Sequence, residues 1–280
     1  MPESSLLETR RAHGTRDGAG MVIQRLHDFS GALDPLLMMD ELQSPAGSEV
    51  LPGFPDHPHR GFETLTLLRR GAMNHSDHLG NRGRIEAGGA QWMRAGRGVI
   101  HSEMPQAGPE GLQAFQLWIN LPASGRMAEP CYADIEAQKM PVLDLDPGTL
   151  TAVAGRWQLE NSESLVDGPI EDLGMQSAGV AWLSLPPGGS TGIALGPSER
   201  LLVRVVSGAL INGPAAAQLG LYGGGDCARL NAGPEPLLAI LVRGRPLDEP
   251  IAQHGPFVMN HPEEIHQALE DYRAGRLTGP

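Results

Sequence analysis

The amino-acid sequence predicts an all-β protein of two barrels with one short helix near the C-terminus. Glycine and proline together account for 61 of the 280 residues (37 plus 24), and they separate short apolar runs along the whole chain. This composition is typical of many short strands joined by turns. The alternation of strand and turn patterns runs through the first half and restarts at Leu150. A restart at similar spacing indicates a second barrel.

The first half contains the denser set of strand patterns. Met21–Leu26 is a short strand candidate, and the apolar segment Leu33–Leu42 is interrupted at Pro35. The polar segment Leu79–Arg84 fits a hairpin loop. Four further strand candidates are separated by Gly, Asn and Pro turns, namely Phe62–Leu68, Gly89–Met93, Gly98–His101 and Ala114–Leu121.

The second half repeats this pattern after a polar connector. Glu129–Thr149 predicts a connector with at most one helical turn. No strict sequence repeat is present, so the duplication is inferred from spacing alone. We therefore expect an N-terminal barrel in residues 1–140 and a C-terminal barrel in residues 141–280. The strand candidates of the second half are Thr151–Leu159, Val180–Leu185, Leu201–Val206 and Leu237–Val242.

One helix is predicted close to the C-terminus. Ile265, Leu269 and Tyr272 lie at positions i, i+4 and i+7 and share one face, and Gly275 is placed to end the helix. We expect this helix and the last ~30 residues to pack back on the N-terminal barrel, with Leu269 and Tyr272 at the contact.

Charge and cysteine content exclude several classes of function. The net charge of −12 argues against direct nucleic-acid binding, which depends on Lys and Arg, although it permits action through a protein partner. Cys131 and Cys227 are too few and too far apart for a disulfide framework or a thiolate metal site. No apolar leader and no run of ~18 apolar residues is present. We therefore expect a cytoplasmic bacterial protein that does not bind membranes and is a monomer.

Two pairs of polar residues predict a metal site in the first half. His57 and His59 are two residues apart, and so are His101 and Glu103. On a strand, this spacing directs both side chains of a pair to the same face. Three imidazoles and one carboxylate suit iron, manganese, nickel, copper or zinc, and they leave open positions on an octahedral ion. Such ligand sets are typical of non-haem iron(II) oxygen chemistry.

The spacing leaves two candidates for the carboxylate ligand. Glu63 is in phase with His57 and His59, so an unbroken strand would also direct it inward. Reasoning from the residues alone does not separate Glu63 from Glu103.

The remaining polar candidates have simpler interpretations. His75 and His78 lie beside a polar turn and are expected to face solvent. Gln116 alternates with apolar neighbours, so it could line a pocket or pack in the core. Trp118 is expected in the core. No histidine occurs between Lys139 and Gln253, so the second barrel is expected to hold no metal.

Four long segments resemble the pirin family nearly residue for residue. They are FPDHPHRGFET (54–64), GNRGRIEAGGAQWMRAGRGVIHSEMP (80–105), QLWINLP (116–122) and QHGPFVMNHPEEIHQALEDYRAGR (253–276). The resemblance is close over about residues 20–140 and over the C-terminal thirty, and loose over 150–250. It implies two cupin barrels, that is, double-stranded β-helices, with one Fe(II) in the N-terminal barrel.

The resemblance also implies ligands and functions. The family's ligand positions fall on His57, His59, His101 and Glu103, which leaves Glu63 a supporting role beside the ligands. One implied function is a quercetin (flavonol) 2,3-dioxygenase, with Glu103 as ligand and as base for the flavonol hydroxyl. The other is an iron-dependent, redox-sensitive transcriptional cofactor or a regulator of a metabolic enzyme. Both need the same metal site, and the open metal positions favour the dioxygenase.

Overall fold

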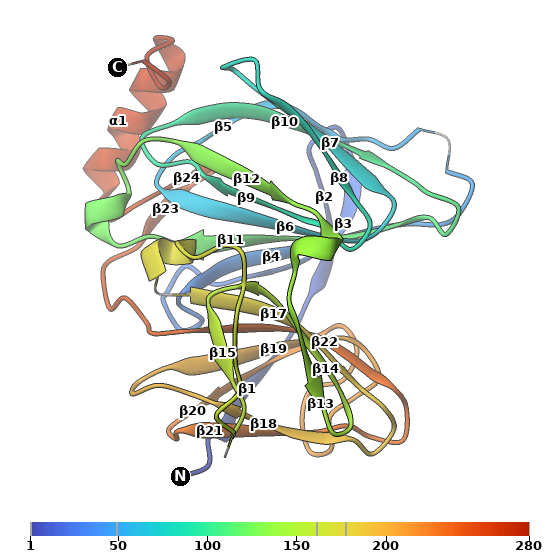
Figure 1. Ribbon diagram of the computed structural model, residues 1–280. Helices are drawn as coiled ribbons and strands as arrows, with labels where there is room; N and C mark the ends of the chain where they lie inside the picture. Colours follow the sequence, from blue (N-terminus) through green and yellow to red (C-terminus); the bar gives the residue numbers. More distant parts are fainter. Residues whose placement is uncertain (1, 49, 161, 177, 280) are drawn as a thin grey trace. The chain divides into compact units, whose positions relative to one another are not determined.

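The computed structural model describes residues 2–48, 50–160, 162–176 and 178–279 (Figure 1). Strands dominate these residues, and the single α-helix among them is α1 (Pro262–Arg273). The predicted all-β class with a C-terminal helix is confirmed. Contacts divide the chain into two compact units. We call the unit with residues 13–32, 36–137 and those from Leu247 onward the N-terminal barrel, and the unit with residues 33–35, 138–246 and those up to Ala12 the C-terminal barrel.

The N-terminal barrel consists of a seven-stranded and a four-stranded antiparallel sheet. The seven-stranded sheet has the order β12-β9-β6-β11-β4-β3-β2, and the four-stranded sheet has the order β5-β10-β7-β8. The bounds of the first set are β2 (His13–Asp17), β3 (Met21–His27), β4 (Leu36–Ser44), β6 (Phe62–Arg70), β9 (Ala90–Arg94), β11 (Leu112–Asn120) and β12 (Cys131–Ile135). The bounds of the second set are β5 (Phe54–His59), β7 (Ala72–Asp77), β8 (Arg82–Glu86) and β10 (Val99–Gln106).

Strand pairing in the four-stranded sheet sets the positions of the polar candidates. In the β5–β10 pair, His57 lies directly opposite His101, and the register shifts between His101 and Glu103. On the other side of β10, Glu103 lies opposite His75 of β7. Directly opposed residues in antiparallel strands project their side chains to the same face. The pairing therefore brings His101 to His57 across 44 positions of the sequence and Glu103 to His75 across 28.

The core of the N-terminal barrel is mainly aliphatic, as the low aromatic content requires. One cluster joins side chains of both sheets, including Leu42, Leu68, Leu112, Met73 and Ile85. A second cluster packs Trp118 with Leu37, Met38, Phe62 and Val258.

The C-terminal helix packs within the N-terminal barrel. Ile265 and Ala268 are buried against the hairpin of β23 (Ala252–His254) and β24 (Phe257–Met259). Leu269 packs on the same cluster, and the ring of Tyr272, although 41 % exposed, lies edge-on to Phe257 with 6.4 Å between the centroids. Gly275 has φ +69°, the left-handed conformation that glycine supplies just after a helix end.

An ion pair ties the helix to the metal-site segment. Nη1 of Arg60, the residue after His59, donates to Oδ2 of Asp271 at 2.8 Å.

The segment Glu129–Thr149, predicted as a connector, contains two strands that its sequence pattern does not predict. β12 pairs with β9, and β13 (Val142–Leu145) pairs with β14 (Gly148–Ala154). Both missed strands lie at the edge of a sheet and are half exposed, so they lack a continuous apolar run.

The C-terminal barrel is built on a second seven-stranded sheet with the order β1-β20-β19-β22-β17-β14-β13. Its core is aliphatic around Trp157. β1 (Ser5–Arg11) pairs with β20 in this barrel, although the sequence pattern predicts residues 1–140 for the N-terminal barrel. The remaining strands are β15 (Arg156–Gln158), β16 (Leu165–Asp167), β17 (Ala178–Leu185), β18 (Ser190–Ala194), β19 (Arg200–Ser207), β20 (Gln218–Gly223), β21 (Cys227–Asn231) and β22 (Leu237–Gly244).

Among the described residues, no helix is long and apolar enough to cross a membrane.

Candidate metal centre

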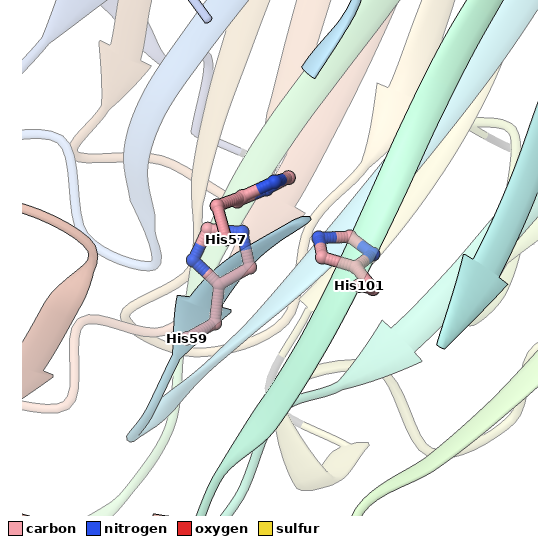
Figure 2. A group of neighbouring side chains, drawn as sticks. All are labelled: His57, His59 and His101. Atoms are coloured by element: carbon pink, nitrogen blue, oxygen red, sulfur yellow. The ribbon is translucent and has the colours of Figure 1, made fainter. Parts of the chain in front are cut away.

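Three histidines converge in the N-terminal barrel. One ring nitrogen from each of His57, His59 and His101 lies within 4.8 Å of the other two (Figure 2). Side chains alternate along β5, so His57 and His59 share one face, and the β5–β10 register brings His101 opposite His57. His59 and His101 are buried, and His57 is partly exposed. The ring centroids lie 4.4 Å apart for His57 and His101 and 5.0 Å apart for His59 and His101.

The hydrogen bonds of these rings leave nitrogens available for an ion. Nδ1 of His57 lies 2.9 Å from the carbonyl oxygen of Pro55, and Nδ1 of His101 lies 3.2 Å from Nε2 of His75. Nε2 of His101 and both ring nitrogens of His59 have no hydrogen-bond partner of standard geometry among the described residues. Leaving a buried polar atom unpaired costs about 1–3 kcal/mol, so such atoms require an explanation. A coordinated metal ion would explain these unpaired nitrogens, and three imidazoles are ligands that such an ion accepts.

The electrostatics also favour metal binding. Burial, reinforced by the neighbouring His57, lowers the pKa of His59 well below its ordinary value, although the backbone of Pro256 acts in the opposite direction. Burial and the neighbouring histidines likewise lower the pKa of His101. The lowered pKa values of His59 and His101 favour their neutral imidazoles, and a neutral imidazole is the form that binds a metal.

Glu103 is buried and held by two hydrogen bonds. Oγ1 of Thr66 donates to its Oε1 at 3.2 Å, and Nε2 of Gln116 donates to its Oε2 at 2.6 Å. Glu103 is not part of the group of three close ligand atoms. Because each carboxylate oxygen can accept more than one interaction, both oxygens keep acceptor capacity. Glu103 as the fourth ligand stays a prediction.

Glu63 is engaged elsewhere. It is fully buried, and its Oε1 accepts a hydrogen bond from Nε of Arg94 at 2.8 Å. The prediction that Glu63 points inward with His57 and His59 assumed one unbroken strand from His57 through Glu63. Instead, the chain turns at Gly61, where φ is +89°, and Glu63 lies on β6 of the other sheet. A Cβ at Gly61 would collide with the carbonyl oxygen of Val258, so the turn depends on glycine.

His75 is placed differently from its predicted position at the surface. It is 3 % exposed and contacts His101 directly. Its ring also packs edge-on against Tyr132, with 5.4 Å between the centroids. The missed signal was the alternation along β7, because Met73, two residues earlier, is buried on the same face. His78 is exposed, as predicted.

A cavity of about 480 Å³ within the N-terminal barrel reaches two of the histidines, His57 and His59. Its wall includes Gln116, and Trp118 contributes both to this wall and to the core. The apolar part of the wall comes from Phe29, Met38, Phe54 and Trp118.

A row of polar side chains places Gln116 at this cavity. Asp40 lies directly opposite Gln116 on one side, and Thr66 lies opposite it on the other. Arg25 lies opposite Asp40 and donates to both of its carboxylate oxygens, at 2.8 and 2.6 Å. Burial raises the pKa of Asp40, and the guanidinium of Arg25 opposes that shift. Charged and hydrogen-bonding groups therefore share the lining of this cavity with the apolar side chains.

The fold and this histidine group define a two-barrel cupin protein with a candidate metal centre in one barrel. The family model described as Pirin matches residues 14–119, and the model described as Pirin C-terminal cupin domain matches residues 180–278. The chain belongs to the pirin family.

Relatives and solved structures agree with this membership. A Pseudomonas aeruginosa protein named "Putative quercetin 2,3-dioxygenase" is 39 % identical and is covered over 97 % of both chains. A crystal structure of quercetin 2,3-dioxygenase from Acinetobacter baumannii superposes with a TM-score of 0.86 at 30 % identity, covering 99 % of both chains. A bacterial pirin from Escherichia coli in complex with nickel(II) is 22 % identical, with a TM-score of 0.57 over 85 % of this chain and 98 % of that one. At 22 % identity, the similarity to the nickel-bound pirin shows a shared fold and nothing more.

Proposed function

We propose that the chain binds one iron(II) ion through His57, His59, His101 and Glu103 and acts as a flavonol 2,3-dioxygenase. The observation that carries this proposal is the pair of buried imidazoles of His59 and His101, whose unpartnered nitrogens lie close to His57, together with a cavity of about 480 Å³ that His57 and His59 line. A cavity of this size fits a small molecule, and its polar groups would fix the orientation of that molecule. The names of the relatives in Pseudomonas and Acinetobacter support the same class of substrate.

The chain's own residues have separate tasks in this reaction. When bound, iron supplies polarisation of a substrate oxygen and redox chemistry toward dioxygen. Trp118, Phe29 and Met38 form an apolar wall that packs against a planar substrate and excludes water. Glu103 accepts the proton of the substrate hydroxyl as general base, a role typically worth ~10²–10⁴-fold in rate. Thr66 and Gln116 keep its carboxylate in place meanwhile.

The test is oxygen consumption and carbon monoxide release by protein reconstituted anaerobically with iron(II). A panel of flavonols is supplied, and metal-free protein and a His57→Ala variant serve as controls. We expect both signals only with iron-loaded wild type and a flavonol. Fully iron-loaded wild type that gives no product with any flavonol would overturn the enzymatic proposal. That outcome would favour a redox-sensitive regulator whose affinity for a protein partner differs between ferrous and ferric states.

A further inference from the structure

We propose that His75 is a positioning residue for the metal centre, and that it fixes the tautomer and the ring orientation of His101. The inference rests on the proposed metal site and assigns a new residue to it. His75 is not expected to touch the metal. It acts through a single contact, between its Nε2 and Nδ1 of His101 at 3.2 Å.

The sheet geometry makes this contact specific. β7 and β10 are antiparallel neighbours, and His75 lies directly opposite Glu103. His101 is two residues away from Glu103 on the same strand and is therefore the diagonal neighbour of His75. Diagonal neighbours on one face of a sheet are within reach of aromatic side chains. The two rings meet at 63° with 5.2 Å between their centroids, which brings one nitrogen of each ring to the other.

The free nitrogen of His101 determines the direction of the hydrogen bond. Nε2 of His101 has no partner among the described residues, so it is the atom left to bind a metal. A ligating nitrogen must offer its lone pair, so the proton of neutral His101 resides on Nδ1. Nδ1 of His101 then donates to Nε2 of His75, and the proton of His75 resides on its own Nδ1.

A second ligand in the same site is oriented by the same principle. Nδ1 of His57 faces the carbonyl oxygen of Pro55 at 2.9 Å, a common acceptor for metal-binding histidines. His101 faces an imidazole instead of a carbonyl or a carboxylate.

The burial of His75 argues against a purely structural role. The side chain is 3 % exposed and packs on Tyr132, yet its Nδ1 has no hydrogen-bond partner among the described residues. A phenylalanine would fill this place without an unpaired polar atom, which is costly when buried. The contact with His101 gives a reason for a histidine here.

The test compares His75→Phe, which keeps a ring but removes the acceptor, with His75→Gln, which restores an acceptor oxygen. Zinc(II) is the probe because it is diamagnetic and takes imidazole ligands. Zinc affinity is measured by chelator competition, and the stability of the metal-free proteins is measured by thermal unfolding. His78→Phe is the control for damage to the same hairpin, because His78 is exposed and contacts the backbone of Ile100.

We expect His75→Phe to bind zinc about 10–100-fold more weakly, the usual effect of removing a partner of a ligand. His75→Gln should recover much of the loss, and His78→Phe should match wild type. Nitrogen-detected NMR of zinc-loaded wild type should show His101 protonated at Nδ1 and bound through Nε2. This readout holds even if a variant fails to fold.

The outcomes separate the two proposals. Wild-type protein that binds neither zinc nor iron would contradict the proposed metal site itself. Wild type that binds zinc, with His75→Phe of equal affinity or with His101 protonated at Nε2, would overturn the role of His75 alone. Equal losses in His75→Phe and His78→Phe would also overturn it, because they would indicate general damage to the hairpin.

Discussion

Nε2 of Gln116 donates a hydrogen bond to Oε2 of Glu103 across 2.6 Å, which connects the wall of the cavity to the predicted carboxylate ligand. The two residues come from different sheets of the N-terminal barrel, β11 and β10. The contact therefore depends on how the barrel closes. Charge-assisted hydrogen bonds of this kind are about twice as strong as neutral ones.

Gln116→Leu should weaken metal binding by about 10–100-fold, because Glu103 loses one of the two donors that orient it. Metal affinity by chelator competition is the measurement. In a Glu103→Ala background the same substitution should have no further effect, since interacting residues are not additive. Gln113→Leu is a matched control, because this glutamine of the same strand also donates to a carboxylate, Oε1 of Glu41 at 2.7 Å. Equal losses in the two leucine variants would count against a specific role.

Purified wild-type protein should contain about one iron per chain. His57→Ala and His101→Ala should each abolish this content, whereas Glu63→Ala should retain most of it. Glu63→Ala should also unfold more easily by roughly 3–5 kcal/mol, because Arg94 loses a buried partner. Elemental analysis of the folded fraction is the check. An empty Glu63 variant together with a full Glu103 variant would reverse the ligand assignment.

Glu103→Gln should damage turnover far more than folding. The amide keeps the shape of the side chain and can still offer an oxygen, but it cannot take the proton of a flavonol hydroxyl. We expect a loss of ~10²–10⁴-fold in kcat at full metal loading, with a changed pH profile. Steady-state kinetics beside thermal unfolding provide the comparison. Unchanged turnover would show that Glu103 is not the general base, and it would leave the proposed dioxygenase activity in place.

Asp271→Asn should destabilise the protein at neutral pH, because Oδ2 of Asp271 accepts the hydrogen bond from Arg60. Hydrogen bonds to charged groups contribute about 1.5–3 kcal/mol, and the partial exposure of Asp271 points to the lower end. Arg60 lowers the pKa of Asp271 below 3.8, the value of a free carboxyl group.

The pH dependence of this contribution has a definite sign. A carboxyl group whose pKa is lowered by folding contributes stability above its unfolded pKa and loses it as pH falls through the folded value. Urea unfolding of wild type and variant should therefore differ by a constant amount near pH 5–7, and the difference should shrink below about pH 3.8. Glu270→Gln, an exposed change on the same helix, should have little effect. A difference that persists at low pH would exclude the ion pair as its cause.

Much of the candidate site could be predicted because its signals are local. His57 and His59 lie two residues apart on β5, and that spacing alone places both rings on one face. The structure then brings His101 opposite His57, which matches the predicted pairing of two strands that each present inward residues. The helix was equally predictable, since Ile265 and Leu269 follow its period and both pack on its hairpin.

Other features depend on neighbours that no local pattern reveals. His75 lies beside a polar turn, and only the pairing of β7 with β10 shows that its ring is buried against His101. Residue spacing alone does not separate Glu63 from Glu103 as the carboxylate ligand. In the structure, the turn at Gly61 places Glu63 on the other sheet, where it accepts a hydrogen bond from Arg94.

The sequence by itself determined the fold class, the three histidines and the barrel that holds them, because strand and helix periods are properties of consecutive residues. The tertiary structure decided which groups surround those histidines, namely His75 at His101 and Gln116 at Glu103. It also decided that β1 pairs with β20 in the C-terminal barrel. These contacts join residues distant in the chain, and only the pairing and register of strands bring them within hydrogen-bond distance.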